Sequence, residues 1–305
     1  MPRVTVVIPT YNRARFVSEA VQSVLNQTYT DREVIVVDDG STDHTHVALD
    51  RFQGQIRYIY QENSGPGAAR NTGVKEAAGD WIAFLDSDDQ WSPEYLYTQM
   101  AAISCCHAEI CMQTTDCCIV GLDGNELNYF DLNGVITGLK GKEYLYITQP
   151  FHFIVSHGPW QVGSTIFSKR GIRMAGWFDT SLRISEDLDL MARMALIGGF
   201  GLIRKCLVRV YRRNETIECL TQRAKSHPIE ARESDEKMYK KLGAIRTLKH
   251  HERIILKKLM SANRRAIGNV HLQNGEIFEA RSSYKKALSM DHSLRSFGRY
   301  LLSYF

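Results

Sequence analysis

The sequence predicts an α/β protein, with a doubly wound, mostly parallel sheet followed by an α-helical C-terminal region. Two β-branched runs, residues 4–8 and 33–37, flank apolar residues at helical spacing between 16 and 25, which is the pattern of a parallel βαβ unit. The pattern recurs through residues 56–85. Beyond residue 234 the apolar positions keep helical spacing without a strand-like run, so we expect only helices there.

The elements of the first half follow one another in a regular order. Residues 4–8 end at Pro9, which closes a buried strand. Residues 56–60 alternate as a third strand, residues 65–78 predict a turn and a helix, and residues 81–85 form a fourth apolar run. In such a sheet the ligand crevice lies at the carboxyl ends of the strands.

The second half gives weaker signals. We expect a hairpin over residues 119–130 and a short helix over residues 141–147. We expect this half to cover the crevice at the strand ends and to select a second substrate.

The composition is that of an ordinary globular protein. The 305 residues are 44% hydrophobic and 24% charged, and no apolar run reaches the roughly 18 to 20 residues that cross a bilayer. Residues 1–3 lead directly into a strand rather than a signal peptide, so we expect a cytoplasmic protein. Five of the seven cysteines lie between residues 105 and 118 without the spacing of a zinc site, which favours reduced, mostly buried thiols.

Polar residues collect where the predicted strands end. Residues 10–12 follow the first strand, residues 38–41 the second, and residues 86–89 the fourth. Parallel strands bring their carboxyl ends together, and turn formation alone would not require this convergence. Asp86 and Asp88 stand two residues apart on an extended chain, so they point to the same side and suit a hard divalent cation with its phosphates.

Five motifs in order resemble glycosyltransferase family 2, the inverting, nucleotide-sugar-dependent enzymes with the GT-A fold. The resemblance runs from about Val4 to Arg213 and implies that fold for this part of the chain. The motifs are Val7-Ile8-Pro9-Thr10-Tyr11-Asn12, Val36-Val37-Asp38-Asp39-Gly40-Ser41-Thr42-Asp43, Gly67-Ala68-Ala69-Arg70-Asn71-Thr72-Gly73, Phe84-Leu85-Asp86-Ser87-Asp88 and Ser185-Glu186-Asp187.

The resemblance implies a catalytic domain of residues 1–215, in which residues 1–100 bind the nucleotide and residues 101–215 bind the acceptor. It also implies which residues bind the donor. It gives Asp39 a hydrogen bond to the nucleotide base and directs Arg70 to the base or the pyrophosphate. It places Pro9, Thr10 and Tyr11 along the base pocket. On the residues alone, a strand-to-helix turn after the second strand and a solvated arginine are the competing explanations.

The resemblance also implies a metal and a general base. Asp88 corresponds to the direct ligand of Mn²⁺ or Mg²⁺ in the DXD motif, and Asp86 is shared between metal and ribose. Asp187 corresponds to the base that deprotonates the acceptor hydroxyl. The residues alone leave another interpretation open, in which Glu186, Asp187 and Asp189 cap a helix.

Two further features concern the acceptor and the phosphates. We expect Trp177 and Glu186 to lie near the acceptor. For a tryptophan, burial in the hydrophobic core is the more frequent explanation. Many relatives carry a histidine where Asn214 stands in this chain. Our hypothesis is that Arg212 or Arg213 takes over the phosphate contact.

The C-terminal region, residues 216–305, is predicted as a separate basic helical unit after the catalytic domain of residues 1–215. Residues 240–305 carry 14 Lys and Arg against 4 Asp and Glu. Residues 266–292 have the spacing of one tetratricopeptide-like hairpin. We expect this region to pack on the catalytic domain. Contact with an anionic membrane or a partner protein is the alternative, and a nucleic acid is disfavoured because interleaved aromatic residues are lacking.

These features predict a metal-dependent inverting glycosyltransferase. It would transfer a sugar from a nucleotide sugar, with UDP-sugar favoured, to a saccharide or lipid-linked acceptor in cell-surface polysaccharide or glycoconjugate synthesis. The alternative is a catalytically silent, nucleotide-binding scaffold whose tail recruits a partner or a membrane, and an intact Asp187 argues against it. A sugar-nucleotide pyrophosphorylase would need a glycine-rich loop that residues 9–13 do not form.

Overall fold

The computed structural model describes residues 3–106, 109–135, 141–158, 160–182, 184–213, 224–291, 296 and 299–300. The chain falls into two compact units. The first comprises residues 1–181 and 190–214, and the second comprises residues 182–189 and 215–305. The short segment 182–189 therefore groups with the C-terminal helices, although it precedes them by many residues in the sequence.

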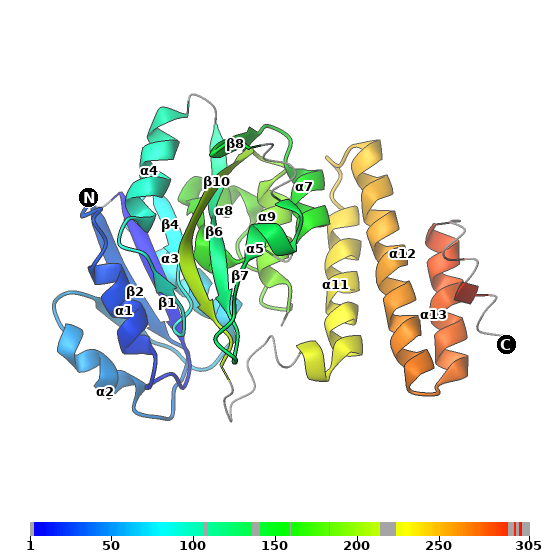
Figure 1. Cartoon of the computed structure of the whole chain (residues 1–305), viewed down its shortest axis with the longest axis horizontal. Coiled ribbons are helices and arrows are strands. Elements are labelled where there is room, and N and C mark those ends of the chain that lie inside the picture. Colours follow the sequence, from blue (N-terminus) through cyan, green and yellow to red (C-terminus); the bar gives the residue numbers. More distant parts are fainter. Residues whose placement is uncertain are drawn as a thin grey trace. The chain divides into compact units, whose positions relative to one another are not determined.

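One sheet organises the first unit (Figure 1). Its strand order is β3-β2-β1-β4-β9-β6-β10-β5, with β7 paired to β6 and β8 paired to β10. The strands are β1 (Val4–Thr10), β2 (Arg32–Asp38), β3 (Arg57–Tyr60), β4 (Trp81–Phe84), β5 (Gln90–Trp91), β6 (Ile110–Val120), β7 (Glu126–Asn128), β8 (Tyr144–Ile147), β9 (Thr165–Ser168) and β10 (Gly199–Tyr211).

Strands β3, β2, β1 and β4 are parallel, as predicted for the doubly wound half. All seven residues of β1 are buried, because the strand lies in the interior of a sheet that is covered on both faces. Thr10 pairs with Asp38, and Val7 pairs with Phe84. The carboxyl ends of β1, β2 and β4 therefore lie at one edge, where the polar segments begin.

The remaining strands make the sheet mixed. Strand β9 is antiparallel to β4 and β6, whereas β6 and β10 are parallel. The predicted hairpin is confirmed, since Val120 of β6 pairs with Glu126 of β7. The predicted helix over residues 141–147 is wrong, because Tyr144–Ile147 form β8 and pair antiparallel with β10. Two tyrosines in a run of four suit a strand once such a partner exists.

Helices pack against this sheet (Figure 1). Helix α3 begins after Gly65, which has φ 89°, and carries a proline in its first turn. The helices are α1 (Val17–Leu25), α2 (Thr45–Leu49), α3 (Pro66–Glu76), α4 (Tyr95–Cys105), α5 (Tyr129–Leu132), α7 (Phe151–His157), α8 (Lys169–Ala175) and α9 (Glu186–Met194). Helix α9 begins within the segment that groups with the second unit.

The second unit is built from α11 (Pro228–Gly243), α12 (His250–Gln273) and α13 (Ile277–Met290). Helices α12 and α13 form a hairpin through Gly275, which has φ 78°. Tyr284 is fully buried in it and donates a hydrogen bond to Asn269 Oδ1 at 2.9 Å. The hairpin lies where the tetratricopeptide-like spacing was noted, and its membership of that repeat class stays a prediction.

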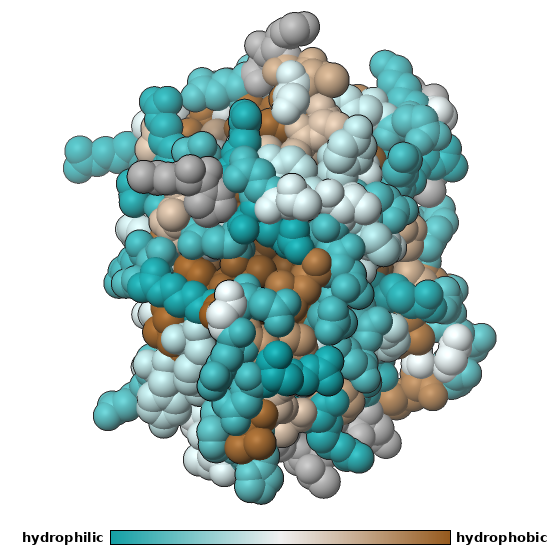
Figure 2. Space-filling model, turned by 90° about the vertical axis from the view of Figure 1, so that its left-hand side faces the viewer, coloured by the Kyte–Doolittle hydropathy of each residue, from teal (hydrophilic) through white to brown (hydrophobic). Residues whose placement is uncertain are grey.

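Hydrophilic residues dominate the face that carries α1 and α2, around a limited hydrophobic area (Figure 2). Within the described ranges, no helix combines the length and the apolar character needed to cross a membrane. The cysteines of the described chain are free thiols, and Cys111, Cys117 and Cys118 are buried while Cys105 and Cys206 are exposed.

Candidate active site

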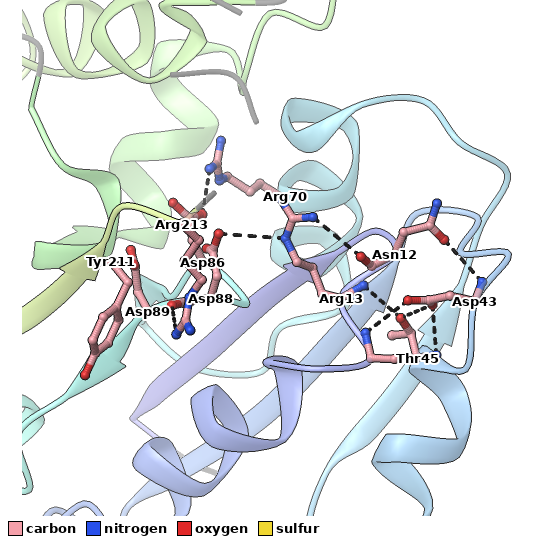
Figure 3. Close-up of polar contacts among 11 residues, drawn as sticks. Asn12, Arg13, Asp43, Thr45, Arg70, Asp86, Asp88, Asp89, Tyr211 and Arg213 are labelled. Carbon is pink, nitrogen blue, oxygen red and sulfur yellow. Dashed lines mark hydrogen bonds and ion pairs between the residues drawn. The ribbon is translucent and has the colours of Figure 1, made fainter. Parts of the chain in front are cut away.

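Three arginines surround the acidic residues that follow β4 (Figure 3). Arg70 Nη2 lies 3.0 Å from Asp86 Oδ1, and Arg13 Nε lies 3.7 Å from Asp88 Oδ2. Arg213 Nη2 donates a hydrogen bond to the carbonyl oxygen of Asp88 at 3.1 Å. Two carboxylates and three guanidinium groups thus share one site, an arrangement suited to a cation together with an anionic ligand.

Arg70 is the most deeply placed of the three cations. It lies on α3 and is only 5% exposed, and its guanidinium group lies 5.6 Å from the centre of the Phe178 ring. A buried guanidinium group needs a partner, and the Asp86 carboxylate supplies one. The structure therefore brings Arg70 and Asp86, two of the predicted site residues, into direct contact.

Arg213 extends from the end of β10 and is held by two aromatic rings. Its guanidinium group lies 4.0 Å from the centre of the Phe16 ring and 4.6 Å from that of Tyr211. Such stacking fixes the planar group without consuming its hydrogen-bond donors. Asn214, the departure noted in the sequence, lies outside the described residues.

Arg13 was not singled out from the sequence. Its backbone N–H donates to Thr45 Oγ1 at 3.0 Å, and its side chain reaches Asp88 from the loop after β1. The available signal was its position, a cation directly after the polar residues that end the first strand. The sequence does not reveal that Arg13 belongs to the site, because its partner Asp88 follows a different strand.

The loop after β1 is fixed to the loop after β2. Asn12 has φ 51°, a left-handed conformation that asparagine tolerates. Its side-chain oxygen accepts hydrogen bonds from the N–H groups of Thr42 at 2.8 Å and Asp43 at 3.3 Å, and its own N–H donates to Ser41 Oγ at 2.8 Å. These bonds set the backbone from which Arg13 extends (Figure 3).

Asp89 differs from its acidic neighbours because it faces the interior. It is 5% exposed, and its carboxylate accepts a hydrogen bond from the Tyr211 N–H at 3.0 Å. Burial, followed by the charges of Asp88 and Asp86, raises the pKa of Asp89 well above its ordinary value. Asp89 therefore anchors the end of β10, and Asp86 and Asp88 are the carboxylates that the segment presents to the arginines.

Asp39 lies at the end of β2 and organises the turn before α3. Its Oδ1 accepts hydrogen bonds from Gln61 Nε2 at 2.6 Å and from the Ser64 N–H at 3.0 Å. Its Oδ2 accepts one from the Gly65 N–H at 2.8 Å. The carboxylate is 3% exposed, so a contact with a nucleotide base would use a remaining lone pair, and that role stays a prediction.

The three residues predicted to line the base pocket differ in exposure. Pro9 and Thr10 are buried in β1, and the side chain of Tyr11 is 40% exposed. Tyr11 is therefore the member of this group that offers a ring to a ligand. The roles of all three stay predictions.

Trp177 lies on a loop that is held by its backbone. Trp177 itself has φ 67°, which is rare for a tryptophan. Its carbonyl accepts a hydrogen bond from Arg193 Nη2 at 2.7 Å. The side chain of Asn71 both donates to the Phe178 carbonyl and accepts from the Phe178 N–H, each at 2.9 Å. The loop is thus fixed to α3 one residue after Arg70, and Trp177 is half-buried.

The acidic motif at the start of α9 belongs to the second unit. Glu186 is 5% exposed and Asp189 is fully buried, whereas Asp187 is partly exposed. Lys241 Nζ lies 3.5 Å from Asp189 Oδ2. Of the three carboxylates in the first turn of α9, Asp187 is therefore the one most accessible to a substrate, and its role as base stays a prediction.

Known proteins resemble this chain in sequence and in fold. The family model described as "Glycosyl transferase family 2" matches residues 5–163, just over half of the chain. The "Succinoglycan biosynthesis protein ExoO" of Rhizobium meliloti (strain 1021) is 34% identical over 202 residues, covering 65% of this chain and 57% of that protein. The chain spans between 14% and 63% of the length of the first curated relatives it matches.

Two solved structures share the fold across 99% of this chain. S. aureus TarS 1–349 in complex with UDP has a TM-score of 0.67 at 19% identity, covering 89% of that chain. The mannosyltransferase PcManGT from Pyrobaculum calidifontis in complex with GDP-Man and Mn²⁺ has a TM-score of 0.62 at 20% identity, covering 79% of that chain. The matching family model, together with the ordered motifs at the ends of β1, β2 and β4, shows that this chain belongs to glycosyl transferase family 2.

Proposed function

We propose that the chain is a metal-dependent inverting glycosyltransferase that uses a nucleotide sugar, with a UDP-sugar favoured. The observation that carries the proposal is the cluster in which Asp86 and Asp88 meet Arg13, Arg70 and Arg213 at the carboxyl ends of β1 and β4. The matched solved structures carry UDP or GDP-Man, which supports a nucleotide sugar as the donor class.

The donor atoms of this cluster fit a divalent metal. Asp86 and Asp88 offer hard carboxylate oxygens, which Mg²⁺ and Mn²⁺ prefer. The described part of the chain has no group of three or more His, Cys, Asp or Glu side chains arranged for a metal, so the protein would supply only part of a coordination sphere. Diphosphate oxygens and water commonly complete such sites, and a matched structure contains Mn²⁺.

The arginines suit the diphosphate of the donor. Guanidinium groups bind phosphate oxygens with charge-assisted hydrogen bonds. Negative charge grows on the nucleoside diphosphate as it leaves the sugar, so cations held in place beforehand stabilise the transition state more than the ground state. The metal, when bound, would contribute to the same stabilisation through Asp86 and Asp88. Asp39 and Tyr11 would bind the nucleoside.

Inversion requires attack from the face opposite the leaving group. The acceptor hydroxyl oxygen forms a bond to the anomeric carbon as the bond from that carbon to the diphosphate oxygen breaks. The hydroxyl proton passes to a carboxylate, for which we propose Asp187. Asp187 is partly exposed at the start of α9, unlike its buried neighbours Glu186 and Asp189.

We propose that residues 101–215 bind a saccharide or lipid-linked acceptor. Trp177 offers a half-buried indole on a fixed loop, and aromatic faces stack on sugar rings. The succinoglycan relative supports a role in polysaccharide synthesis. Lys257, Lys258 and Lys285 are exposed on α12 and α13, and they would support a peripheral contact with an anionic membrane that presents such an acceptor.

The proposal is tested by nucleotide release from UDP-, GDP- and dTDP-sugars in the presence of Mn²⁺, with and without chelator. We expect turnover only with metal and a loss of about 100-fold or more in Asp88→Asn, since one stabilising contact at the leaving group contributes that much. Glu94→Gln is the matched control, because Glu94 is exposed and lies outside the cluster. An NMR assay of the product should show an inverted anomeric configuration.

Two outcomes would contradict the proposal in different ways. Unchanged turnover in Asp88→Asn, or in chelator, would remove the metal role. Binding of UDP and Mn²⁺ without turnover of any donor, with water or with crude glycan and lipid acceptors, would favour the silent scaffold.

A further inference from the structure

Helix α11 forms hydrogen bonds to the segment 182–189, which carries the acidic motif. Ser234 Oγ donates a hydrogen bond to the Ile184 carbonyl at 2.7 Å. The next residue on the helix, Asp235, accepts a hydrogen bond from Ser185 Oγ on its Oδ1 at 2.6 Å. Two adjacent residues of α11 thus hold two adjacent residues of the segment, one through its backbone and one through its side chain. All four belong to the second unit.

The backbone of segment 182–189 has an uncommon conformation at Ser185. Ser185 has φ 69°, in the left-handed region that residues other than glycine rarely adopt. Such a conformation persists where surrounding contacts hold it. The carbonyl of Ser185 also accepts the hydrogen bond of the Asp189 N–H at 3.0 Å, which is among the first helical bonds of α9. The conformation of Ser185 therefore sets where the helix starts and how its first turn is oriented.

The contact from α11 is partly buried and continues along the helix. Burial raises the pKa of Asp235, against the opposing effects of the Ser185 hydroxyl and Arg232. Lys241 of the same helix meets the fully buried Asp189. The α11 residues therefore hold the segment on both sides of Asp187, at positions 184, 185 and 189.

We propose that Asp235 is a positioning residue for catalysis. Together with Ser234 it holds Ser185 in its left-handed conformation and so orients the first turn of α9, on which Asp187 lies. The inference rests on the proposed role of Asp187 as the base. It gives the C-terminal region, which lies beyond the residues matched by the family model, a part in the reaction that is separate from any membrane or partner contact.

The expected signature is a fall in turnover without a loss of donor binding. In Asp235→Ala the Ser185 hydroxyl loses its acceptor, so the first turn of α9 loses one of the contacts that orient it. We expect kcat to fall about tenfold or more, because displacements of about 1 Å cost this much or more in enzymes. The donor KM and the affinity for UDP with Mn²⁺, measured by calorimetry, should stay within about twofold of wild type, since this variant leaves Asp86 and Asp88 unchanged.

Matched variants separate the hydrogen bond from general packing. Asp235→Asn keeps an oxygen acceptor for Ser185 and should retain most of the turnover. Ser185→Ala should reproduce the loss seen in Asp235→Ala, and the double variant should lose no more than either single variant, because both remove one interaction. Glu233→Ala is the control on the same helix, since Glu233 is exposed, and it should behave as wild type.

The melting temperature of each variant and the transfer activity of Asp187→Asn are measured in parallel. A purely structural contact would lower the melting temperature and leave kcat per folded molecule unchanged. That result in both Asp235→Ala and Ser185→Ala, with Asp187→Asn inactive, would overturn the positioning role alone. Full transfer by Asp187→Asn would overturn the base assignment, and the positioning role with it. If Asp235→Ala does not fold, the comparison of Ser185→Ala with Asp235→Asn decides.

Discussion

Replacing Gly73 with alanine should push α3 away from β1. A Cβ atom at position 73 would lie 2.3 Å from Val7 Cγ1 and 2.8 Å from Val7 Cγ2, distances that carbon atoms do not tolerate. Val7 is fully buried in the middle of β1, and its branched side chain has little rotamer freedom. The valine cannot turn aside, so the helix or the strand must shift.

Two opposing effects decide the size of the change. Overpacking a well-packed core costs about 1 to 3 kcal/mol, and alanine gains about 0.8 to 1 kcal/mol over glycine within a helix. The net loss of unfolding free energy therefore lies between about 0 and 2 kcal/mol, and the two close contacts of the added Cβ place Gly73 at the upper end of this range. At about 2 kcal/mol, a unit of this size should lose roughly 4 to 8 °C in melting temperature.

Tryptophan fluorescence during urea unfolding provides the assay. All four tryptophans lie in the first unit, at positions 81, 91, 160 and 177. Gly163→Ala is the control in the same unit, because an added Cβ at position 163 meets the Phe84 carbonyl oxygen at 3.9 Å, an ordinary van der Waals distance. Arg70 lies one helical turn before Gly73, so Gly73→Ala should also weaken UDP binding. Wild-type stability in Gly73→Ala would refute the reasoning that this glycine sets the distance between helix and strand.

Two further predictions concern charge. Burial alone would raise the pKa of Glu236, but Lys240 and Arg264 hold it below its ordinary value. Glu236 therefore stabilises the helices at pH values above about 4.5, and this contribution is lost as the pH falls through the lowered pKa. In circular dichroism melts, Glu236→Gln should be less stable than wild type at neutral pH, and the difference in stability should close in acid. A difference that stays constant with pH would contradict this. Arg213→Ala should weaken UDP binding about 10- to 100-fold by calorimetry, because hydrogen bonds to charged groups are worth about 1.5 to 3 kcal/mol. Arg204 is an exposed arginine of β10, the strand that Arg213 follows, and Arg204→Ala should have no effect. Equal UDP affinities of the two variants would reject the phosphate contact of Arg213.

The parallel half of the fold could be predicted because its signals are local. β-branched runs and helical spacing lie within a few residues of one another, so β1, β2 and β4 were found where the sequence placed them. Strand β8 was predicted as a helix because its state depends on pairing with β10, which follows much later in the chain. Strand β6 gave no clear signal. Its buried Gln113 donates to Gln99, and its buried Asp116 accepts from the Phe130 N–H, partners that a strand-like alternation does not reveal.

The site was predictable to the same extent. Asp86, Asp88 and Arg70 belong to local motifs, and the structure places them in one cluster. Arg13 escaped notice because its contact with Asp88 joins two loops that are distant in the sequence. Asp235 escaped for the same reason, since nothing near it in the sequence suggests a contact with Ser185.

The backbone anchoring of the Trp177 loop has a consequence for how such enzymes diversify. The loop is held by Asn71 and Arg193 through main-chain atoms of residues 177 and 178, so its shape does not depend on the indole. The side chain at position 177 can then be exchanged while its surroundings stay in place, and glycine or asparagine would even relieve its left-handed backbone. Given the acceptor role proposed for Trp177, acceptor preference would change through substitutions at this one position, and a small library at residue 177 is a natural starting point for testing that role.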